Sequence, residues 1–324
     1  MTASAPLVSV LMTAYNRERY IGAAIESVLA QTFDDFELVI VDDGSSDNTV
    51  EIARKYAELD PRIRIARNTV NLGDYPNRNH AASLGRGRFL KYHDSDDVMY
   101  PHCLSTMAPA LLAEPRAGFA LSTAGSWPGG PCPMLLTPRL SYQREFLGSG
   151  MFNCGPASAL FRRDVFHALG GFGAFGAASD YIFWLTACAR YPVLLLPGDL
   201  FWYRTHAGQE IAGARAAEDY SRTPHHAWRA LASPECPLEA AEREMARRNL
   251  AFITARTIWR HLKRRDWSLA VLTFRSSGLT ARDWMRYLRR QRRTWLIGTP
   301  TGSDGEFLEP TWPAAQHKRD TVPR

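Results

Sequence analysis

The first 125 residues of this 324-residue chain alternate between strand and helix patterns, and this alternation constrains the fold more than any other feature. The nearly continuous apolar run LVSVLMTAY, at residues 7–15, predicts a strand that is covered on both faces. Further strands are predicted in FELVIVDD, RIRIAR, RFLKYHD and AGFALS, with a helix pattern between successive strands. Strands that alternate with helices over short turns form a mostly parallel sheet with helices on its faces. We therefore predict an α/β fold with a Rossmann-like sheet.

Local signals mark the ends of the predicted helices. Ser46 or Asp47 is suited to cap the second helix. Pro76 suits the first turn of a third helix that stops at Gly85, and Pro101 opens a fourth. The Pro- and Gly-rich stretch from residue 125 to about 150 predicts a loop. Beyond it, SDYIFWLTACARYP predicts a helix, and VLLLPG and LFWYRTH predict strands.

Polar residues follow three of the predicted strands, in TAYN, VDDGSSD and HDSDD. In a parallel sheet these strand ends lie at one edge, where such folds bind ligands. The third cluster holds Asp94, Asp96 and Asp97, and a turn after the strand can bring Asp94 and Asp96 to one cation. Carboxylates suit Mg²⁺ or Mn²⁺, whose remaining positions are filled by water and phosphate oxygens. An acidic turn without chemistry is the alternative.

Other phosphate chemistries fit the sequence less well. HDSDDV also matches the Asp-x-Asp-x-(Thr/Val) signature of haloacid-dehalogenase-like phosphatases, in which the first Asp is a nucleophile. That family places its motif after the first strand, whereas this motif follows the fourth, and the downstream GDLFWY lacks the second acid. The first 125 residues contain no Gly-x-Gly-x-x-Gly, and the chain contains no Walker A sequence, so its phosphates would be neutralised by a metal and by Arg.

The charge of the chain is concentrated near its C-terminal end. The net charge is +6, and residues 243–293 contain 15 Lys and Arg against three acids, together with several Trp. Such a tract could face anionic lipid, a phosphorylated acceptor or nucleic acid, or it could be a solvated helical face. We expect no nucleic-acid partner, and the Trp-rich helices are either a peripheral membrane anchor or an appendage packed on the core.

Cysteine usage and hydropathy indicate the compartment. The five cysteines are odd in number and form no Cys-x-x-Cys pair, which argues against structural zinc and disulfides. The N-terminus lacks the positive region of a signal peptide, and no run approaches the ~20 apolar residues of a membrane span. We expect a cytoplasmic protein whose membrane contact is at most peripheral.

Three long segments carry a family resemblance: SVLMTAYNRERYIGAAIESVLAQTFDDFELVIVDDGSSDNTVEIARKYA, NLGDYPNRNHAASLGRGRFLKYHDSDD and GPASALFRRDVFHALGGF. Together they resemble family 2 inverting glycosyltransferases with the GT-A fold, over roughly residues 6–210. The resemblance implies transfer of a sugar from a nucleotide-sugar, with a UDP-sugar expected, to a hydroxyl of a carbohydrate or glycolipid acceptor. It also implies inversion at the anomeric carbon, use of Mn²⁺ or Mg²⁺, and a place in polysaccharide or glycolipid assembly.

The predicted domains follow from this resemblance. Residues 1–236 would form the catalytic domain, with a nucleotide-sugar half at about 1–125 and an acceptor half at about 126–236. Residues 237–298 would form the basic helical region and 299–324 a loose tail.

The resemblance also assigns the nucleotide site. Thr13, Ala14 and Tyr15 would line the nucleotide pocket, with Tyr15 stacked on the base. Asp43 would accept a hydrogen bond from the base, and Arg78 would reach the diphosphate.

The metal site is implied in the same way. Asp94 would contact ribose or metal, Ser95 would contact the nucleotide, and Asp96 would bind the metal. Asp97 is the second choice for the metal, and His206 lies where many relatives carry a His near the diphosphate and metal.

The general base is expected in an acidic pair after GGF and before an aromatic helix. Only Asp180 is present there, because Ser179 replaces the first acid of the pair. Asp180 would take the proton of the acceptor hydroxyl, and a plain helix cap is the alternative. The missing acid motivates a second hypothesis, a degenerate transferase that binds nucleotide-sugar without turnover. A sugar nucleotidyltransferase shares the sheet but needs a Gly-rich, basic loop that TAYNRERY lacks.

Overall fold

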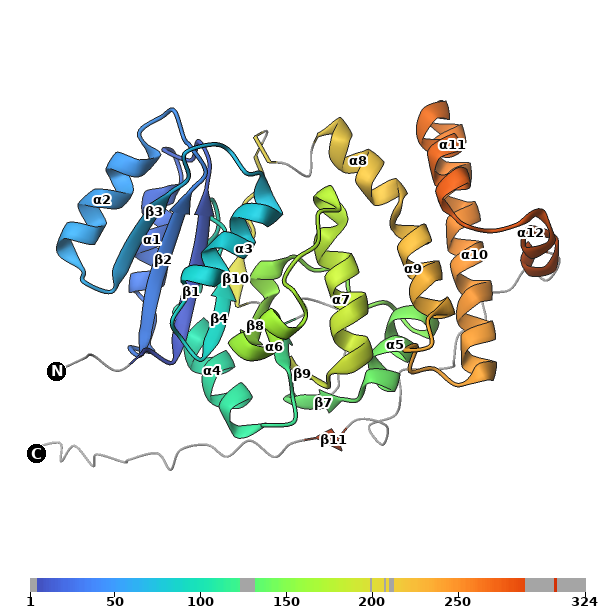
Figure 1. The fold of residues 1–324 in the computed structure, drawn as a ribbon, viewed down its shortest axis with the longest axis horizontal. Helices are drawn as coiled ribbons and strands as arrows, with labels where there is room; N and C mark the ends of the chain where they lie inside the picture. The colour runs from blue at the N-terminus through green and yellow to red at the C-terminus, as the bar shows by residue number, and fades with distance from the viewer. Residues whose placement is uncertain are drawn as a thin grey trace, which may run out of the picture.

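A central nine-stranded sheet forms the core of the computed structural model, which describes residues 5–122, 132–198, 200–206, 208–209, 213–288 and 306–307. Its strand order is β11-β7-β9-β6-β8-β4-β1-β2-β3 (Figure 1). The pairs within β4-β1-β2-β3 are parallel, β8 is antiparallel to both of its neighbours, and β6 and β9 are again parallel. The strands of this sheet are β1 (Val8–Ala14), β2 (Phe36–Asp42), β3 (Ile63–Arg67), β4 (Phe89–Tyr92), β6 (Phe119–Ser122), β7 (Met134–Leu136), β8 (Ala159–Arg162), β9 (Val193–Leu196) and β11 (Glu306–Phe307).

Helices cover both faces of the sheet and extend from one end of it. The helices up to residue 190 are α1 (Ile21–Leu29), α2 (Thr49–Leu59), α3 (Asp74–Leu84), α4 (Cys103–Ala113), α5 (Pro138–Leu147), α6 (Arg163–Ala168) and α7 (Ser179–Arg190). The C-terminal helices are α8 (Ala214–Ser221), α9 (Thr223–Ala232), α10 (Ala240–Lys263), α11 (Trp267–Ser276) and α12 (Ala281–Leu288). They stand together beyond α7 (Figure 1), so the predicted α/β fold with a helical appendage is confirmed.

The two faces of the sheet follow from the alternation of side chains along each strand. In β1, Val8, Val10 and Met12 point to the face covered by α1, α2 and α4. Leu11 points to the opposite face, with α3 and the aromatic side chains of the acceptor half. Both sets are fully buried, because a strand inside a sheet that carries helices on both faces has no solvent side.

The register of the parallel strands brings the three polar clusters together. Ala14 of β1 lies opposite Asp42 of β2, and Leu11 lies opposite Tyr92 of β4. The residues that follow these strands therefore emerge at the same edge of the sheet.

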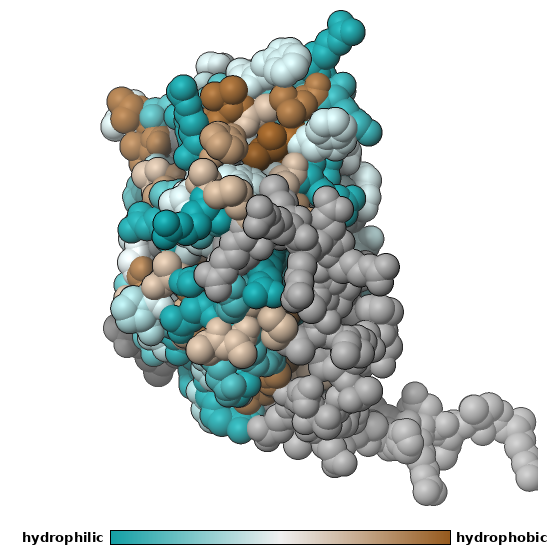
Figure 2. All heavy atoms as spheres, turned by 90° about the vertical axis from the view of Figure 1, so that its right-hand side faces the viewer, coloured by the Kyte–Doolittle hydropathy of each residue, from teal (hydrophilic) through white to brown (hydrophobic). Residues whose placement is uncertain are grey.

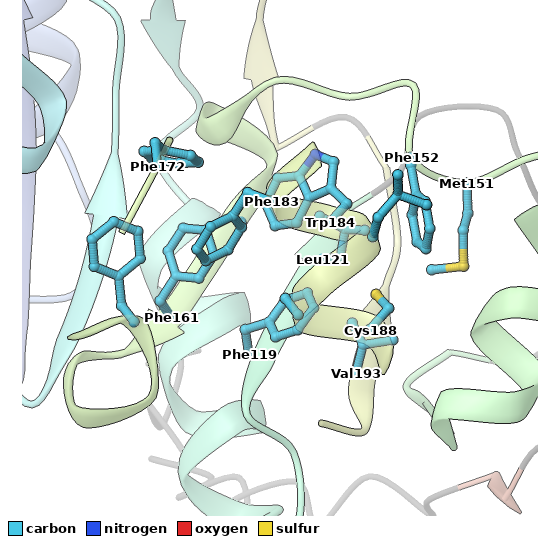
Figure 3. Packing of buried hydrophobic residues seen from close by; sticks show 14 of the residues in the cluster. Phe119, Leu121, Met151, Phe152, Phe161, Phe172, Phe183, Trp184, Cys188 and Val193 are labelled. Atoms are coloured by element: carbon cyan, nitrogen blue, oxygen red, sulfur yellow. The ribbon is translucent and has the colours of Figure 1, made fainter. Parts of the chain in front are cut away.

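An aromatic cluster packs against the part of the sheet that contains β6, β8 and β9 (Figure 3). Trp184 of α7 is fully buried and stacks on Phe161, with ring centroids 5.7 Å apart. Its indole N–H donates to the carbonyl of Cys154 at 2.9 Å, which ties α7 to the loop before β8. Since Asp180 lies in the first turn of α7, this packing also fixes the position of its carboxylate.

Some predicted element boundaries are wrong. The stretch predicted as a loop up to residue 150 contains β7 and α5, although residues 123–131 lie outside the described residues. The signal for α5 is present in the sequence, because Thr137 caps the helix through a bond from the Leu140 N–H and Pro138 occupies its first turn. The strand expected in LFWYRTH is only β10 (Phe201–Trp202), which pairs with β5 (Val98–Met99) in a separate two-stranded sheet. Helix α3 begins at Asp74, so Pro76 lies in its first turn and Gly85 follows its end as predicted, whereas α4 begins at Cys103 rather than at Pro101.

The C-terminal region returns to the sheet. Helix α10 packs on α5, α9 and α11, and β11 pairs antiparallel with β7. Apart from 306–307, residues 289–324, which include Trp295, lie outside the described part of the chain. Within that part no helix is long and apolar enough to cross a membrane. The proposed boundaries at 236 and 298 stay predictions.

Candidate active site

A cleft of about 550 Å³ opens at the carboxyl ends of β1, β2 and β4. It gathers eight residues that the sequence predicts for nucleotide or metal binding: Thr13, Ala14, Tyr15, Asp43, Arg78, Asp94, Ser95 and Asp96. Asp97, Asp180 and His206 are not among the described residues that line it. The three strand ends therefore converge on one binding cleft, as their register requires.

The turn after β1 presents Tyr15 to the cleft. Asn16 has a φ of 52°, a left-handed conformation that Asn tolerates, and its N–H donates to Ser45 Oγ at 2.9 Å. The next N–H, that of Arg17, donates to Thr49 Oγ1 at 2.7 Å. The ring of Tyr15 is 47% exposed, so it is free to stack on a planar ligand.

Asp43 holds the far wall of the cleft. Its Oδ1 accepts from the N–H of Leu72 at 2.9 Å and from Asn68 Nδ2 at 2.7 Å, while Oδ2 accepts from the N–H of Gly73 at 2.9 Å. These bonds order the turn that leads into α3. The carboxylate retains acceptor capacity toward a ligand.

Arg78 lies between two carboxylates at the base of the cleft. Its Nε donates to Asp74 Oδ1 at 2.8 Å, and its Nη1 lies 2.7 Å from Asp94 Oδ1. Burial would lower the pKa of Arg78, but Asp74 and Asp94 raise it well above the ordinary value. Burial would likewise raise the pKa of Asp94, but the Arg78 guanidinium holds it below the ordinary value. The pair is therefore charged.

Asp96 connects the cleft to the segment that follows β10, because its carboxylate contacts residues of both. Its Oδ2 is 3.0 Å from both Arg17 Nε and His206 Nε2. His206 Nδ1 accepts from the N–H of Gly208 at 3.2 Å, so the ring proton lies on Nε2 and is donated to Asp96. The His206 ring also stacks on Tyr20, with centroids 4.5 Å apart. A carboxylate and an imidazole, the two ligand types of the predicted metal site, are thus in contact.

Asp97 points away from the cleft. Its Oδ1 accepts from the backbone N–H of Arg204 at 3.0 Å, and Arg204 Nε donates to the carbonyl of Asp96 at 2.7 Å. Burial and the neighbouring Asp94 raise the pKa of Asp97 well above its usual range. In this arrangement Asp97 anchors the segment that follows β10, and its predicted metal role stays a prediction.

Asp180 lies beside a second cavity, of about 1040 Å³, which adjoins the first. Tyr203 and Tyr220 line both. Burial raises the pKa of Asp180 to about 6, although the Tyr181 backbone N–H and the Tyr75 hydroxyl bond to its carboxylate. Asp180 is the second residue of α7, after Ser179, so the plain N-cap alternative does not describe it.

Ser179 stabilises the turn before α7 through its side-chain hydroxyl. Its Oγ accepts from the Phe175 N–H at 3.1 Å and donates to the carbonyl of Gly176 at 2.7 Å. The side chain therefore closes the turn ahead of α7 and is fully buried.

Sequence reasoning missed two charged residues of the cleft, Arg17 and Asp74. Arg17 follows the first strand end directly, and Asp74 precedes Arg78 by four residues, the spacing of an ion pair on one helix face. The sequence also assigned no role to His93. This residue is fully buried, and its Nε2 lies 3.3 Å from Ser27 Oγ. His93 therefore joins β4 to α1.

Comparisons with known proteins identify the family and the fold. Residues 9–170, half of the chain, match the model of glycosyl transferase family 2. An uncharacterized glycosyltransferase of Haemophilus influenzae is 37% identical over 106 residues, 33% of each chain. The UDP-Glc:alpha-D-GlcNAc-diphosphoundecaprenol beta-1,3-glucosyltransferase WfgD of Escherichia coli is 39% identical over 106 residues, 33% of this chain and 41% of WfgD. The chain thus matches only about a third to two fifths of these relatives' length.

Two solved structures share the fold. S. aureus TarS 1–349 in complex with UDP-GlcNAc has a TM-score of 0.59 at 21% identity, covering 87% of this chain and 79% of TarS. The mannosyltransferase PcManGT from Pyrobaculum calidifontis, in complex with GDP-Man and Mn²⁺, has a TM-score of 0.57 at 17% identity, covering 89% and 80%. The predicted GT-A fold is confirmed, and the chain belongs to glycosyl transferase family 2.

Proposed function

We propose that this chain transfers a sugar from a nucleotide-diphosphate sugar to an acceptor hydroxyl, with inversion and with the help of Mn²⁺ or Mg²⁺. The observation that carries the proposal is the convergence of Tyr15, Asp43, Arg78, Asp94 and Asp96 in one cleft. An exposed ring, a carboxylate and a buried guanidinium are the groups that would hold a base, a ribose and a diphosphate.

The donor is proposed to be a UDP-sugar. WfgD is named for a UDP-Glc donor and TarS was solved with UDP-GlcNAc, whereas PcManGT was solved with GDP-Man. In our proposal Tyr15 stacks on the base, Asp43 accepts from it, and Arg78 contacts the diphosphate.

The residues at the cleft fit a divalent metal ion. Asp96 would supply a carboxylate oxygen ligand, and His206 Nε2 lies 3.0 Å from it. His206 would become a nitrogen ligand only by giving up the Nε2 proton that it donates to Asp96 here, with its ring proton then on Nδ1 in place of the bond from the Gly208 N–H. No group of three or more His, Cys, Asp or Glu arranged to hold a metal occurs among the described residues, so diphosphate and water would complete the coordination. Bound there, the metal would neutralise the charge that develops on the leaving diphosphate.

Asp180 is proposed as the general base. A raised pKa of about 6 leaves the carboxylate ionised at neutral pH, yet basic enough to take a proton from an acceptor hydroxyl. The Tyr75 hydroxyl and the Tyr181 N–H orient it. Attack of the acceptor hydroxyl on the face of the sugar opposite the leaving diphosphate would invert the anomeric carbon.

The acceptor is proposed to be a carbohydrate or glycolipid in polysaccharide or glycolipid assembly, and the C-terminal helices are proposed to contact a membrane surface. Helix α11 exposes Trp267, Val271 and Phe274, at 64%, 49% and 53%, which share one stripe at offsets of four and seven residues. Figure 2 shows hydrophobic patches among hydrophilic side chains on the face formed by the C-terminal helices. Exposed Arg264 and Arg265 adjoin the stripe, and this combination fits anionic lipid.

A cytoplasmic location is also proposed. All five cysteines are unpaired, as is usual in a reducing compartment.

The test is a titration of UDP, UDP-glucose, UDP-GlcNAc and GDP-mannose with and without Mn²⁺, followed by slow donor hydrolysis. We expect Mn²⁺-dependent binding of a UDP-sugar, weakened at least tenfold in Asp96→Ala and unchanged in Asp60→Ala, whose carboxylate pairs with Arg62. Binding of no nucleotide-sugar under any metal condition would overturn the proposal. Binding without hydrolysis or transfer would support the degenerate protein that Ser179 motivated.

A further inference from the structure

The cavity beside Asp180 is closed by helices that lie outside the region matched by the family model. One wall comes from the loop before β8 and from α5, within residues 9–170. The opposite wall comes from α8 to α11, through residues such as Ala227, Leu250, Ile253 and Thr257. The C-terminal helices therefore shape a binding cavity as well as an outer surface.

The charged groups of this cavity differ from those of the donor cleft, whose described lining carries two Arg beside four Asp. Arg17 and Arg78 line the donor cleft, but no Lys, Arg or His occurs among the described residues that line the second cavity. Its ionisable acids are Asp180 and Glu145, and Glu145 Oε2 is held by the N–H groups of Met151 and Phe152 at 2.8 and 3.0 Å. A phosphate moved into this cavity would lose its hydration, gain no counter-charge and face two carboxyl groups.

The uncharged part of the lining divides into an apolar wall and a polar rim. Leu250 and Ile253 of α10 face the side that carries Phe146, Met151 and Phe152. Ser149 and Asn153 are exposed at the mouth and offer hydrogen bonds to hydroxyl groups. The volume, about 1040 Å³, is at the upper end of ligand pockets and leaves room for more than one sugar ring.

We propose that the second cavity binds a neutral glycoside with an apolar aglycone, its sugar hydroxyl at Asp180 and its aglycone along Leu250 and Ile253 of α10. The proposal rests on the proposed transferase function and names its acceptor class. It excludes sugar phosphates and lipid diphosphates from this cavity, although the basic C-terminal tract suggested a phosphorylated acceptor.

The experiment compares three forms of each acceptor sugar: the octyl glycoside, the methyl glycoside and the sugar 1-phosphate. Glucose, galactose, mannose and N-acetylglucosamine are used, with the donor that the titration above identifies. Both binding and transfer are measured. We expect kcat/KM to be at least tenfold higher for the octyl glycoside of the preferred sugar than for its methyl glycoside or its 1-phosphate.

The variant Ile253→Arg places a cation in the apolar wall. We expect it to lower kcat/KM for the octyl glycoside at least tenfold and to reduce the discrimination against the 1-phosphate. Donor binding and donor hydrolysis without acceptor should stay within twofold. Trp259→Ala is the matched control, because Trp259 lies on the same helix, is 60% exposed and is not part of the described lining of the cavity.

The proposal would be overturned by a higher kcat/KM for the 1-phosphate than for the octyl glycoside, or by equal kcat/KM values for the octyl and methyl glycosides. It would also be overturned if Ile253→Arg had the same kcat/KM for the octyl glycoside as the wild type. Donor hydrolysis in an enzyme that binds none of the neutral glycosides would overturn it as well. Failure of the transferase function itself would be recognised separately, by the absence of any donor binding or hydrolysis.

Discussion

Arg78 and Asp94 form a buried ion pair, with Nη1 and Oδ1 2.7 Å apart, and this pair joins α3 to the end of β4. The guanidinium also binds Asp74 one helical turn away, so one cation balances two carboxylates. The donor cleft is therefore built around a charge that the fold itself requires.

Replacing Arg78 by Ala should destabilise the protein by about 2 kcal/mol, because the partly buried carboxylates of Asp74 and Asp94 would lose their cation. Arg78→Lys keeps the positive charge, so its loss of free energy of unfolding should be smaller. Urea unfolding measures both, with Arg54→Ala as the control, since Arg54 is 60% exposed and its pair with Glu51 is a surface contact. A loss no larger than that of the control would contradict the pairing.

Transfer should depend on the ionisation of Asp180. Since its pKa is raised to about 6 and the base must be ionised, kcat/KM should rise with pH through about 6 and then level off. Asp180→Asn should lower transfer by about 10²–10⁴-fold and leave the Kd of the donor unchanged. The same pH dependence in the variant, or loss of donor binding, would remove Asp180 from the role of base.

Two glycines should respond in opposite directions to substitution by Ala. At Gly87 a Cβ would lie 2.5 Å from the backbone N of Ser9, so Gly87→Ala should cost about 1–3 kcal/mol. At Gly155 a Cβ would meet nothing within 4 Å and φ is −76°, so Gly155→Ala should be neutral or stabilise by about 0.4–1 kcal/mol. Thermal and urea unfolding of both variants test this, and equal effects would contradict the packing of Gly87 against β1.

The protein should lose stability in mild acid because of His93. Burial, and then the nearby Lys91, lower the pKa of His93 to about 3, so the folded state binds this proton more weakly than the unfolded chain. The contribution of neutral His93 to the free energy of unfolding is complete above about pH 6.5 and is lost as the pH falls toward 3. Between pH 6.5 and pH 5 the free energy of unfolding should fall by about 2 kcal/mol. In urea unfolding, the free energy of unfolding of His93→Gln should therefore fall less than that of the wild type over this pH range. An identical loss in the variant would assign the acid sensitivity to other groups.

Binding to anionic vesicles should depend on the α11 stripe. Trp267→Ala combined with Phe274→Ala should reduce the partition into phosphatidylglycerol-containing vesicles at least tenfold, with weaker binding to phosphatidylcholine and at high salt. Leu59→Ala is the control, because Leu59 is 83% exposed at the end of α2, far from α11 (Figure 1). Equal binding of the double variant and wild type in a sedimentation assay would exclude the stripe as the contact.

The donor half of the fold could be predicted from the sequence because its signals are local. Strands buried on both faces read as apolar runs, and parallel pairing places TAYN, VDDGSSD and HDSDD at one edge without any knowledge of long-range contacts. The cleft accordingly contains Tyr15, Asp43 and Asp96 as expected.

The remaining features depend on contacts between distant segments. The contact of Asp96 with His206 requires β10 to pair with β5, which no local pattern indicates. The second cavity joins Asp180 to Ile253, on helices 50 residues and more apart, and its lack of cations appears only when both walls are assembled. Helix α5 was missed for a different reason, because the Pro- and Gly-rich sequence before it concealed the Thr137 cap.

The short strand β11 gives the C-terminal segment a protective task. It covers β7 at the border of the nine-stranded sheet, where Met134, Leu135 and Leu136 would otherwise offer unpaired backbone groups beside apolar side chains. An uncovered apolar border of this kind is a template for pairing with a second molecule. We expect a shortened chain that ends after α12 to keep the described residues that line both cavities and to self-associate more readily than the full chain.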